Sequence, residues 1–190
     1  MAFQHQTAPR YPALRSDIAK ALAVVVASIA VTLAYFAVLD RPWGCDCGRL
    51  WAMPGESALN SRVMLDPYSA LHLIFGAVLA LILRRVRPGW SGWTVLAVVV
   101  AGSTVWEVVE NLPSSILLFG YEAGDPLSYE GDSRLNALAD TASAALGAVL
   151  ARGLSGRVVL AVAAVTELGL SLWINDGFAI ATLRAMGQFV

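Results

Sequence analysis

The chain has 190 residues, of which 57% are hydrophobic and only 14% are charged, and its formal net charge is −1. This composition is too apolar for an ordinary soluble domain, and the apolar residues are gathered into long runs. The near-zero charge and the lack of a long basic tract argue against a nucleic-acid partner. We therefore predict an all-α, polytopic transmembrane helical bundle.

Five apolar runs predict five membrane-spanning helices in a single transmembrane domain, residues 18–190. The first run, of about 22 residues, is long enough to cross ~30 Å of hydrocarbon at ~1.5 Å per residue. Basic residues precede it, so a cleaved signal peptide is the alternative to a retained helix. The predicted spans are 18–39, 68–83, 93–111, 133–151 and 158–174, between an N-terminal cytoplasmic tail at 1–17 and a short interfacial or re-entrant helix at 178–190.

Cap residues indicate where several of these helices begin and end. Asp66 followed by Pro67 predicts a helix N-cap with proline at the first helical position. Pro113 must end or kink the third span. Asp132 is a second candidate N-cap, at the start of the fourth span.

Lysine and arginine residues predict the orientation in the membrane. With the N-terminus in the cytoplasm, the cytoplasmic segments collect eight basic residues against one acid, Asp17, whereas acids outnumber the five basic residues on the other side. The positive-inside rule then places the N-terminus in the cytoplasm and the C-terminus in the periplasm of a cell inner-membrane protein. The eight are Arg10, Arg15, Lys20, Arg84, Arg85, Arg87, Arg152 and Arg157.

The third span carries carboxylates inside an apolar stretch. Glu107, Glu110 and Asn111 are spaced i, i+3, i+4, so a helix projects them from one face. An ionisable group in a bilayer costs about 2.5–3.5 kcal/mol on insertion scales, so such groups turn towards a bundle interior or a wet cavity. Counted from the outer helix ends, acidic or imidazole side chains of four spans lie at similar depth in the outer half of the membrane.

We therefore predict an outward-facing polar pocket near the periplasmic surface. Its central members are His72, Glu107, Glu110 and Asp140, and its other members are Asp66, Asn111, Asp132, Asn136 and Glu167. Imidazole and carboxylates are suitable ligands for a divalent metal ion. The same groups can serve as acid and base in catalysis, or can only hydrogen-bond one another and fix the register of the helices. The residues alone leave these readings open.

Cys45 and Cys47 lie in the loop between the first two predicted spans, on the predicted periplasmic side. An oxidising compartment permits a disulfide there, and a metal site is an alternative. Because the two-residue spacing predicts a strained ring, an easily reduced bridge, free thiols and a structural disulfide all stay open. The two cysteines are a candidate redox pair.

Short sequence blocks carry a resemblance to a known family. They are Trp43-Gly-Cys-Asp-Cys-Gly48, Asn60-Ser61, Asp66-Pro-Tyr-Ser-x-x-His72-x-x-x-Gly76, Trp106-Glu-x-x-Glu-Asn-x-Pro113 and Gly131-Asp-Ser-x-x-Asn136-x-x-x-Asp140. The combination resembles an uncharacterised, mostly alphaproteobacterial family of multi-pass inner-membrane proteins, over nearly the whole chain. It is more distantly similar to VanZ-like membrane proteins. The resemblance implies placement in the inner membrane and little chemistry.

Two classes of function fit these features. In the first, a non-enzymatic membrane protein binds a lipid, an ion or a partner membrane protein in its pocket and supports envelope homeostasis. In the second, the four central residues hydrolyse a lipid-linked or envelope substrate by acid–base or metal-assisted chemistry. We favour the first class. A transporter is a third option, which the lack of internal repeats makes a poor fit to the inverted-repeat scheme.

Overall fold

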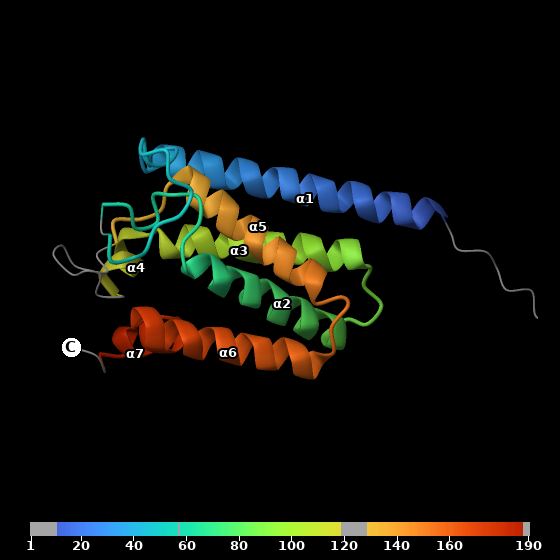
Figure 1. Ribbon diagram of the computed structural model, residues 1–190. Coiled ribbons are helices and arrows are strands. Elements are labelled where there is room, and N and C mark those ends of the chain that lie inside the picture. Colours follow the sequence, from blue (N-terminus) through green and yellow to red (C-terminus); the bar gives the residue numbers. More distant parts are fainter. Residues whose placement is uncertain (1–10, 57, 119–128, 188–190) are drawn as a thin grey trace, which may run out of the picture.

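The computed structural model describes residues 11–56, 58–118 and 129–187, which form a helical bundle (Figure 1). An isolated β-bridge between Trp51 and Leu65 is the only extended pairing within these ranges, so the prediction of an all-α bundle is confirmed. The helices are α1 (Tyr11–Val38), α2 (Tyr68–Val86), α3 (Gly92–Glu110), α4 (Pro113–Leu118), α5 (Arg134–Leu150), α6 (Gly156–Ile174) and α7 (Phe178–Ala185).

Helix α5 is the central element of the bundle and contacts α1, α2 and α3. Helix α1 packs on α3, and α6 packs on α2 at the opposite side of the bundle (Figure 1). The loop after α1 and the short helices α4 and α7 gather at one end, where α2 and α5 begin and α3 ends. This end carries the polar residues described below.

The backbones of α2 and α5 touch where they cross. A methyl group added at Gly76 would lie 1.9 Å from the carbonyl oxygen of Ala144, and one added at Gly147 would lie 1.9 Å from that of Leu73. Both positions therefore require a residue without a Cβ atom. Small residues on facing helices allow this close approach, which is a usual means of helix association in membranes.

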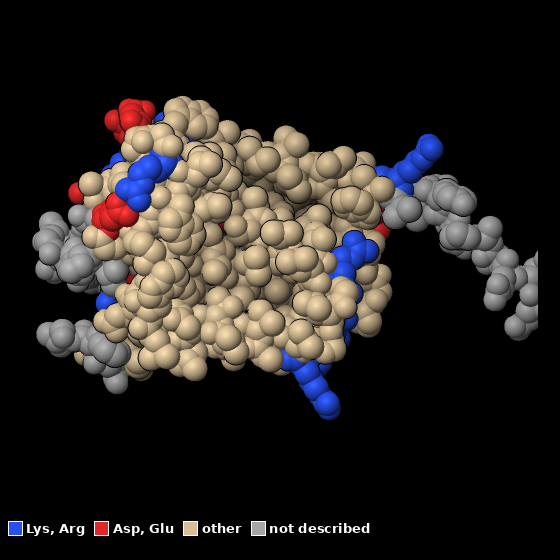
Figure 2. All heavy atoms as spheres, viewed as in Figure 1, with Lys and Arg blue, Asp and Glu red and all other residues tan. Residues whose placement is uncertain are grey.

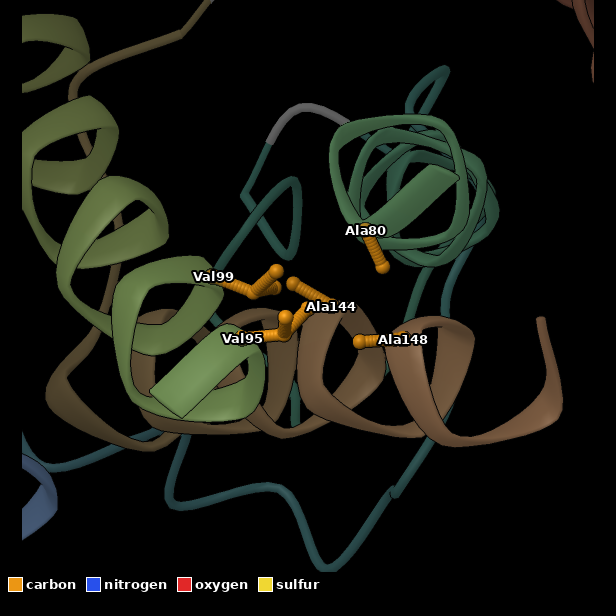
Figure 3. Close-up of a cluster of buried hydrophobic side chains, with 5 residues drawn as sticks. All are labelled: Ala80, Val95, Val99, Ala144 and Ala148. Atoms are coloured by element: carbon orange, nitrogen blue, oxygen red, sulfur yellow. The ribbon is translucent and has the colours of Figure 1, made fainter. Parts of the chain in front are cut away.

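A buried apolar cluster continues the contact towards the other end of the bundle. Figure 3 shows Ala80 of α2, Val95 and Val99 of α3, and Ala144 and Ala148 of α5 pointing toward one another. Three of the five residues are alanines, because the helices are so close that little side-chain volume fits between them. Dispersion contacts of this kind, rather than burial from water, stabilise helix pairs in lipid.

Four helices are long and apolar enough to cross a membrane, which indicates a membrane protein. They are α2, α3 and α6 over their whole lengths and α1 over Arg15–Val38. Within the described residues, four helices and not the predicted five therefore meet the length and hydropathy expected of a span. The helix predicted at 133–151 is present as α5, but it has 17 residues and buries Asn136 and Asp140. It packs against α1, α2 and α3, and it leaves Leu146, Val149 and Leu150 exposed on the outside of the bundle.

Other helix ends agree with the prediction or differ by a few residues. Residues 1–10 and 188–190 lie outside the described part of the chain, so only the rest of the predicted tail and of the C-terminal segment is compared. Helix α1 begins at Tyr11, within the predicted tail at 1–17. The predicted short C-terminal helix is α7, and α4 starts at Pro113, where the third span was expected to end or kink.

Charged side chains are segregated along the bundle. Figure 2 shows that almost all charged residues on this face lie at the two ends, with a belt of uncharged residues between them. The arginines that follow α2 and flank the turn into α6 are at the end opposite α7. Such a belt between two charged ends is the surface that a bilayer-spanning bundle needs.

We expect Gly76→Ala to destabilise the protein. Its methyl group must push α2 and α5 apart, and overpacking of this kind costs about 1–3 kcal/mol. For a chain of this size the expected fall in Tm is roughly 3–10 °C, measured by tryptophan fluorescence in detergent. Gly169→Ala in α6 is the matched control, since nothing lies within 4 Å of its added methyl group. Equal Tm values for both variants would contradict the close contact.

Candidate functional site

A polar cavity of about 110 Å³ lies at the end of the bundle that carries α7. Four of the predicted pocket residues line it, namely His72, Glu110, Asp132 and Asp140. Helix α7 contributes Phe178, Ala181 and Thr182, which the sequence analysis did not include in the pocket. The cavity therefore has acidic and imidazole groups from α2, α3, α5 and the loop before α5, with an apolar wall from α7.

His72 lies between two carboxylates. Its Nδ1 atom is 3.4 Å from Glu107 Oε1, and its Nε2 atom is 3.8 Å from Asp140 Oδ2. Glu107 is 0% exposed, and neither of its carboxylate oxygens has a hydrogen-bond partner among the described residues. The sequence predicted that these three side chains lie at a similar depth in the membrane, and the structure brings them together from α2, α3 and α5.

Asp66 connects the start of α2 to α5. Its Oδ1 atom accepts hydrogen bonds from the backbone N–H groups of Tyr68 at 2.9 Å and Ser69 at 3.3 Å, so it caps α2 as predicted. Its Oδ2 atom accepts from Asn136 Nδ2 at 3.4 Å and from Ser61 Oγ at 3.4 Å. Both oxygens are therefore used, and one residue sets the position of two helices and a loop.

Asp132 is not the N-cap of α5, and that prediction is wrong. Ser133 takes the role, and its hydroxyl accepts from the Asn136 backbone N–H at 3.1 Å. Asp132 instead exchanges two hydrogen bonds with Asn111: its backbone N–H donates to Asn111 Oδ1 at 2.8 Å, and its Oδ2 accepts from Asn111 Nδ2. The pair joins the end of α3 to the start of α5.

Burial changes the acidity of the two loop carboxylates. Desolvation, reinforced by the charge of Asp132, raises the pKa of Asp66 to about 6 despite its hydrogen bonds. Desolvation also raises the pKa of Asp132, against the opposing effect of the bonds from Asn111. The outer part of the cluster therefore holds its protons to a higher pH than exposed aspartates do.

Glu167 does not reach this cavity, although it was predicted among the pocket residues. Its carboxylate accepts from the backbone N–H groups of Phe178 at 3.2 Å and Ala179 at 2.8 Å, at the start of α7. It therefore fixes α7 against α6. Counting residues gave the correct depth for this side chain but not the direction in which it points around the helix.

A second, apolar groove of about 560 Å³ lies between α2 and α6. Its walls include Ile74 and Val78 on α2 and Ala163 and Ala164 on α6. Phe178 of α7 lines both this groove and the polar cavity. The first residue of α7 is therefore a wall shared by the two hollows.

The loop after α1 closes the end of the bundle. Cys45 and Cys47 form a disulfide in this loop, with Cα atoms 5.1 Å apart. The guanidinium of Arg41 donates to the carbonyl oxygen of Glu130 and fills the space beside Gly131, whose φ is +98°. These contacts hold the segment before α5, and with it Asp132, over the polar cavity.

Tyr129 and Asp176 are two of the buried residues near the cavity that the sequence analysis did not place in the pocket. Tyr129 lines the cavity but belongs to a loop segment without periodicity, so no pattern indicated it. Asp176 accepts from the Tyr68 hydroxyl at 2.8 Å and joins α2 to the junction of α6 and α7. The sequence signal for Asp176 was its position directly after Asn175, a residue type that often ends helices. Asn175 has a left-handed φ of 53°.

Fold and site together define a helical membrane protein with a buried acidic and imidazole cluster near one end of its bundle. The chain belongs to the family described as "Protein of unknown function (DUF2585)", which matches residues 36–187. The predicted resemblance to an uncharacterised alphaproteobacterial family is thereby confirmed. The more distant likeness to VanZ-like proteins is not shown by these comparisons.

Curated relatives carry the same kind of name. A UPF0314 protein of Rhizobium meliloti is 34% identical over 152 residues, which are 77% of this chain and 75% of the relative. A UPF0314 protein of Sphingopyxis alaskensis is 32% identical over 163 residues, or 84% and 86% of the two chains. One of Paracoccus denitrificans is 36% identical over 147 residues, or 75% and 74%. No solved structure matches the chain with significance.

We expect the raised pKa of Asp66 to make the wild-type protein less stable as the pH rises from about 4 to about 7. The folded state keeps this proton to a higher pH than the unfolded chain, so its stabilising effect is full below the unfolded pKa and is lost through the folded pKa. The full loss amounts to roughly 3 kcal/mol for a change in pKa of this size.

The measurement is Tm in detergent against pH for wild type and Asp66→Asn. Asparagine still caps α2 but has no proton to lose, so the variant should show a flatter profile. Asp46→Asn, at an exposed loop position, should follow the wild type. Parallel profiles for wild type and Asp66→Asn would show that this carboxyl does not titrate in the expected range.

Proposed function

We propose that this chain is a multi-pass protein of the cell inner membrane that binds an amphipathic lipid, with the lipid head group in the polar cavity and its chain in the groove between α2 and α6. The N-terminus lies in the cytoplasm, and the cavity opens on the periplasmic side. This is the binding class favoured from the sequence, restricted to one ligand.

The distribution of charge supports the orientation. Arg84 and Arg85 in the last turn of α2, and Arg152 and Arg157 around the turn into α6, lie at the end opposite the cavity. Acidic side chains such as Glu56 and Glu130 lie at the cavity end. The positive-inside rule assigns the basic end to the cytoplasm.

The observation that carries the proposal is that Phe178 lines both hollows, so the polar cavity and the apolar groove are neighbours. The groove walls are aliphatic and aromatic apart from Glu167, whose carboxylate is held by backbone N–H groups of α7. In a bilayer, a groove of this kind is filled by hydrocarbon. The adjoining cavity offers acceptors from Glu110 and Asp132, so a head group with amine or hydroxyl donors fits there.

Hydrolysis of a lipid-linked substrate is a second candidate, favoured by the position of His72 between Glu107 and Asp140. An imidazole beside carboxylates can act as a general base. The two functions differ in what happens to the lipid. A binding protein releases it unchanged, whereas a hydrolase releases cleaved products, and mass spectrometry of lipid incubated with the protein separates the two.

We expect labelling with a membrane-impermeant maleimide on spheroplasts to report the orientation. In a background of Cys45→Ser and Cys47→Ser, Glu56→Cys should be labelled in intact spheroplasts because it lies at the cavity end. Ser155→Cys, in the turn between α5 and α6, should be labelled only after permeabilisation. The reverse pattern would place the cavity in the cytoplasm.

We expect Ala164→Trp to reduce lipid binding at least tenfold by filling the groove. The protein is delipidated in detergent and incubated with phosphatidylethanolamine or phosphatidylglycerol, and bound lipid is counted by native mass spectrometry. Val162→Trp is the matched control, because Val162 is also exposed on α6 and does not line the groove. Equal lipid occupancy in the two variants would overturn the proposal.

A further inference from the structure

We infer that one divalent transition-metal ion binds beside the polar cavity, held by His72 and Glu110 of its lining and by the fully buried Glu107. The inference deepens the proposed function and rests on it only for access to the cavity from the periplasmic side. It assigns a chemical role to the buried cluster that lipid binding alone does not require.

The three side chains are already close to metal-binding geometry. One ligand atom from each can be chosen so that all lie within 4.8 Å of one another. Three ligand atoms about 2.0–2.2 Å from one ion are roughly 3.3–3.8 Å apart in tetrahedral or trigonal geometry, so side-chain shifts of up to about 1 Å suffice. Glu107 and Glu110 are spaced i, i+3 on α3, so both carboxylates lie on the side of α3 that faces His72.

Unpartnered carboxylate oxygens give a second, independent reason. Both oxygens of Glu107 are fully buried and lack hydrogen-bond partners among the described residues, and so does Oδ1 of Asp140. None of the described residues that line the cavity is a lysine or arginine. A buried carboxylate without a donor or a cation is strongly disfavoured, and a metal ion satisfies several oxygens at once.

Asp140 is best explained as a positioning residue. It lies on the Nε2 side of His72 at 3.8 Å, whereas Glu107 lies on the Nδ1 side at 3.4 Å. Histidine ligands commonly donate their second ring nitrogen to a carboxylate, which fixes the ring and raises its basicity. Asp140 on α5 would orient His72 in this way while Nδ1 binds the ion.

The donor set indicates the class of ion. One imidazole nitrogen with two carboxylates suits Zn²⁺ or Mn²⁺, whereas Mg²⁺ and Ca²⁺ prefer oxygen ligands alone. We therefore expect binding of Zn²⁺ or Mn²⁺ at submillimolar concentration, with Mg²⁺ and Ca²⁺ unable to displace it. One ion per chain is the expected stoichiometry.

The test uses the full-length protein in detergent, stripped with chelator and dialysed against Zn²⁺ or Mn²⁺, with bound metal measured by elemental analysis. Glu107→Gln and His72→Ala should each weaken binding at least tenfold. Glu130→Gln is the matched control, since this carboxylate is exposed and lies outside the cavity. Where Glu107→Gln does not fold, Glu110→Gln at the cavity wall gives the same readout.

A positioning role for Asp140 predicts results that differ from those expected for a direct metal ligand. Asp140→Asn should keep the site but weaken it 10–100-fold and shift the visible absorption bands of the Co²⁺-loaded protein, and Asp140→Glu should restore part of the affinity. Less than about 0.1 ion per wild-type chain, or wild-type binding by both Glu107→Gln and Glu110→Gln, would overturn the inference. Lipid retained by the metal-free protein in that case would leave the proposed function intact.

Discussion

The backbone contact between α2 and α5 determines the geometry of the rest of the molecule. Gly76 and Gly147 bring the two helices so close that carbonyl oxygens lie where Cβ atoms would otherwise be. His72 is one helical turn before Gly76, and Asp140 is one turn before Ala144, on the same faces of their helices. The close crossing therefore sets the distance between His72 and Asp140.

Helix α3 joins this pair by the same principle. In the first half of α3, Val95 and Val99 pack against small residues of α5. Glu107 lies two turns further along α3 and contacts His72. At the outer end, hydrogen bonds replace apolar packing, since the Asn111–Asp132 pair ties α3 to α5. Along the axis of the bundle, apolar packing thus gives way to a network of hydrogen bonds. The cavity lies at the boundary between these two regions.

Much of this arrangement follows from residue patterns. Apolar runs and the Asp66–Pro67 cap locate the helices to within a few residues, and depth counting brings His72, Glu107 and Asp140 to one level. The same counting fails for Glu167, because height along a helix says nothing about which neighbour the residue faces. The N-cap of α5 was misassigned because Asp132 and Ser133 are both good caps, and only the tertiary bond to Asn111 separates them.

The number of apolar spans could not be read correctly for a related reason. A run of alanine and leucine around Asp140 has the length of a crossing helix, but its polar groups are acceptable only when α2 and α3 surround them. Hydropathy averaged over a sequence window describes a segment in isolation, whereas the position of α5 depends on the helices packed against it. Tyr129 and the α7 residues of the cavity wall are likewise assembled by tertiary contacts between distant segments.

The polarity of α5 has a consequence for biogenesis. A segment with a buried aspartate and asparagine partitions poorly into lipid by itself, at a cost of about 2.5–3.5 kcal/mol for the aspartate alone. In a bilayer such a segment is accommodated once α2 and α3 cover its polar face, or together with apolar α6 as a hairpin. By either route, α5 depends on its neighbours to cover its buried aspartate and asparagine.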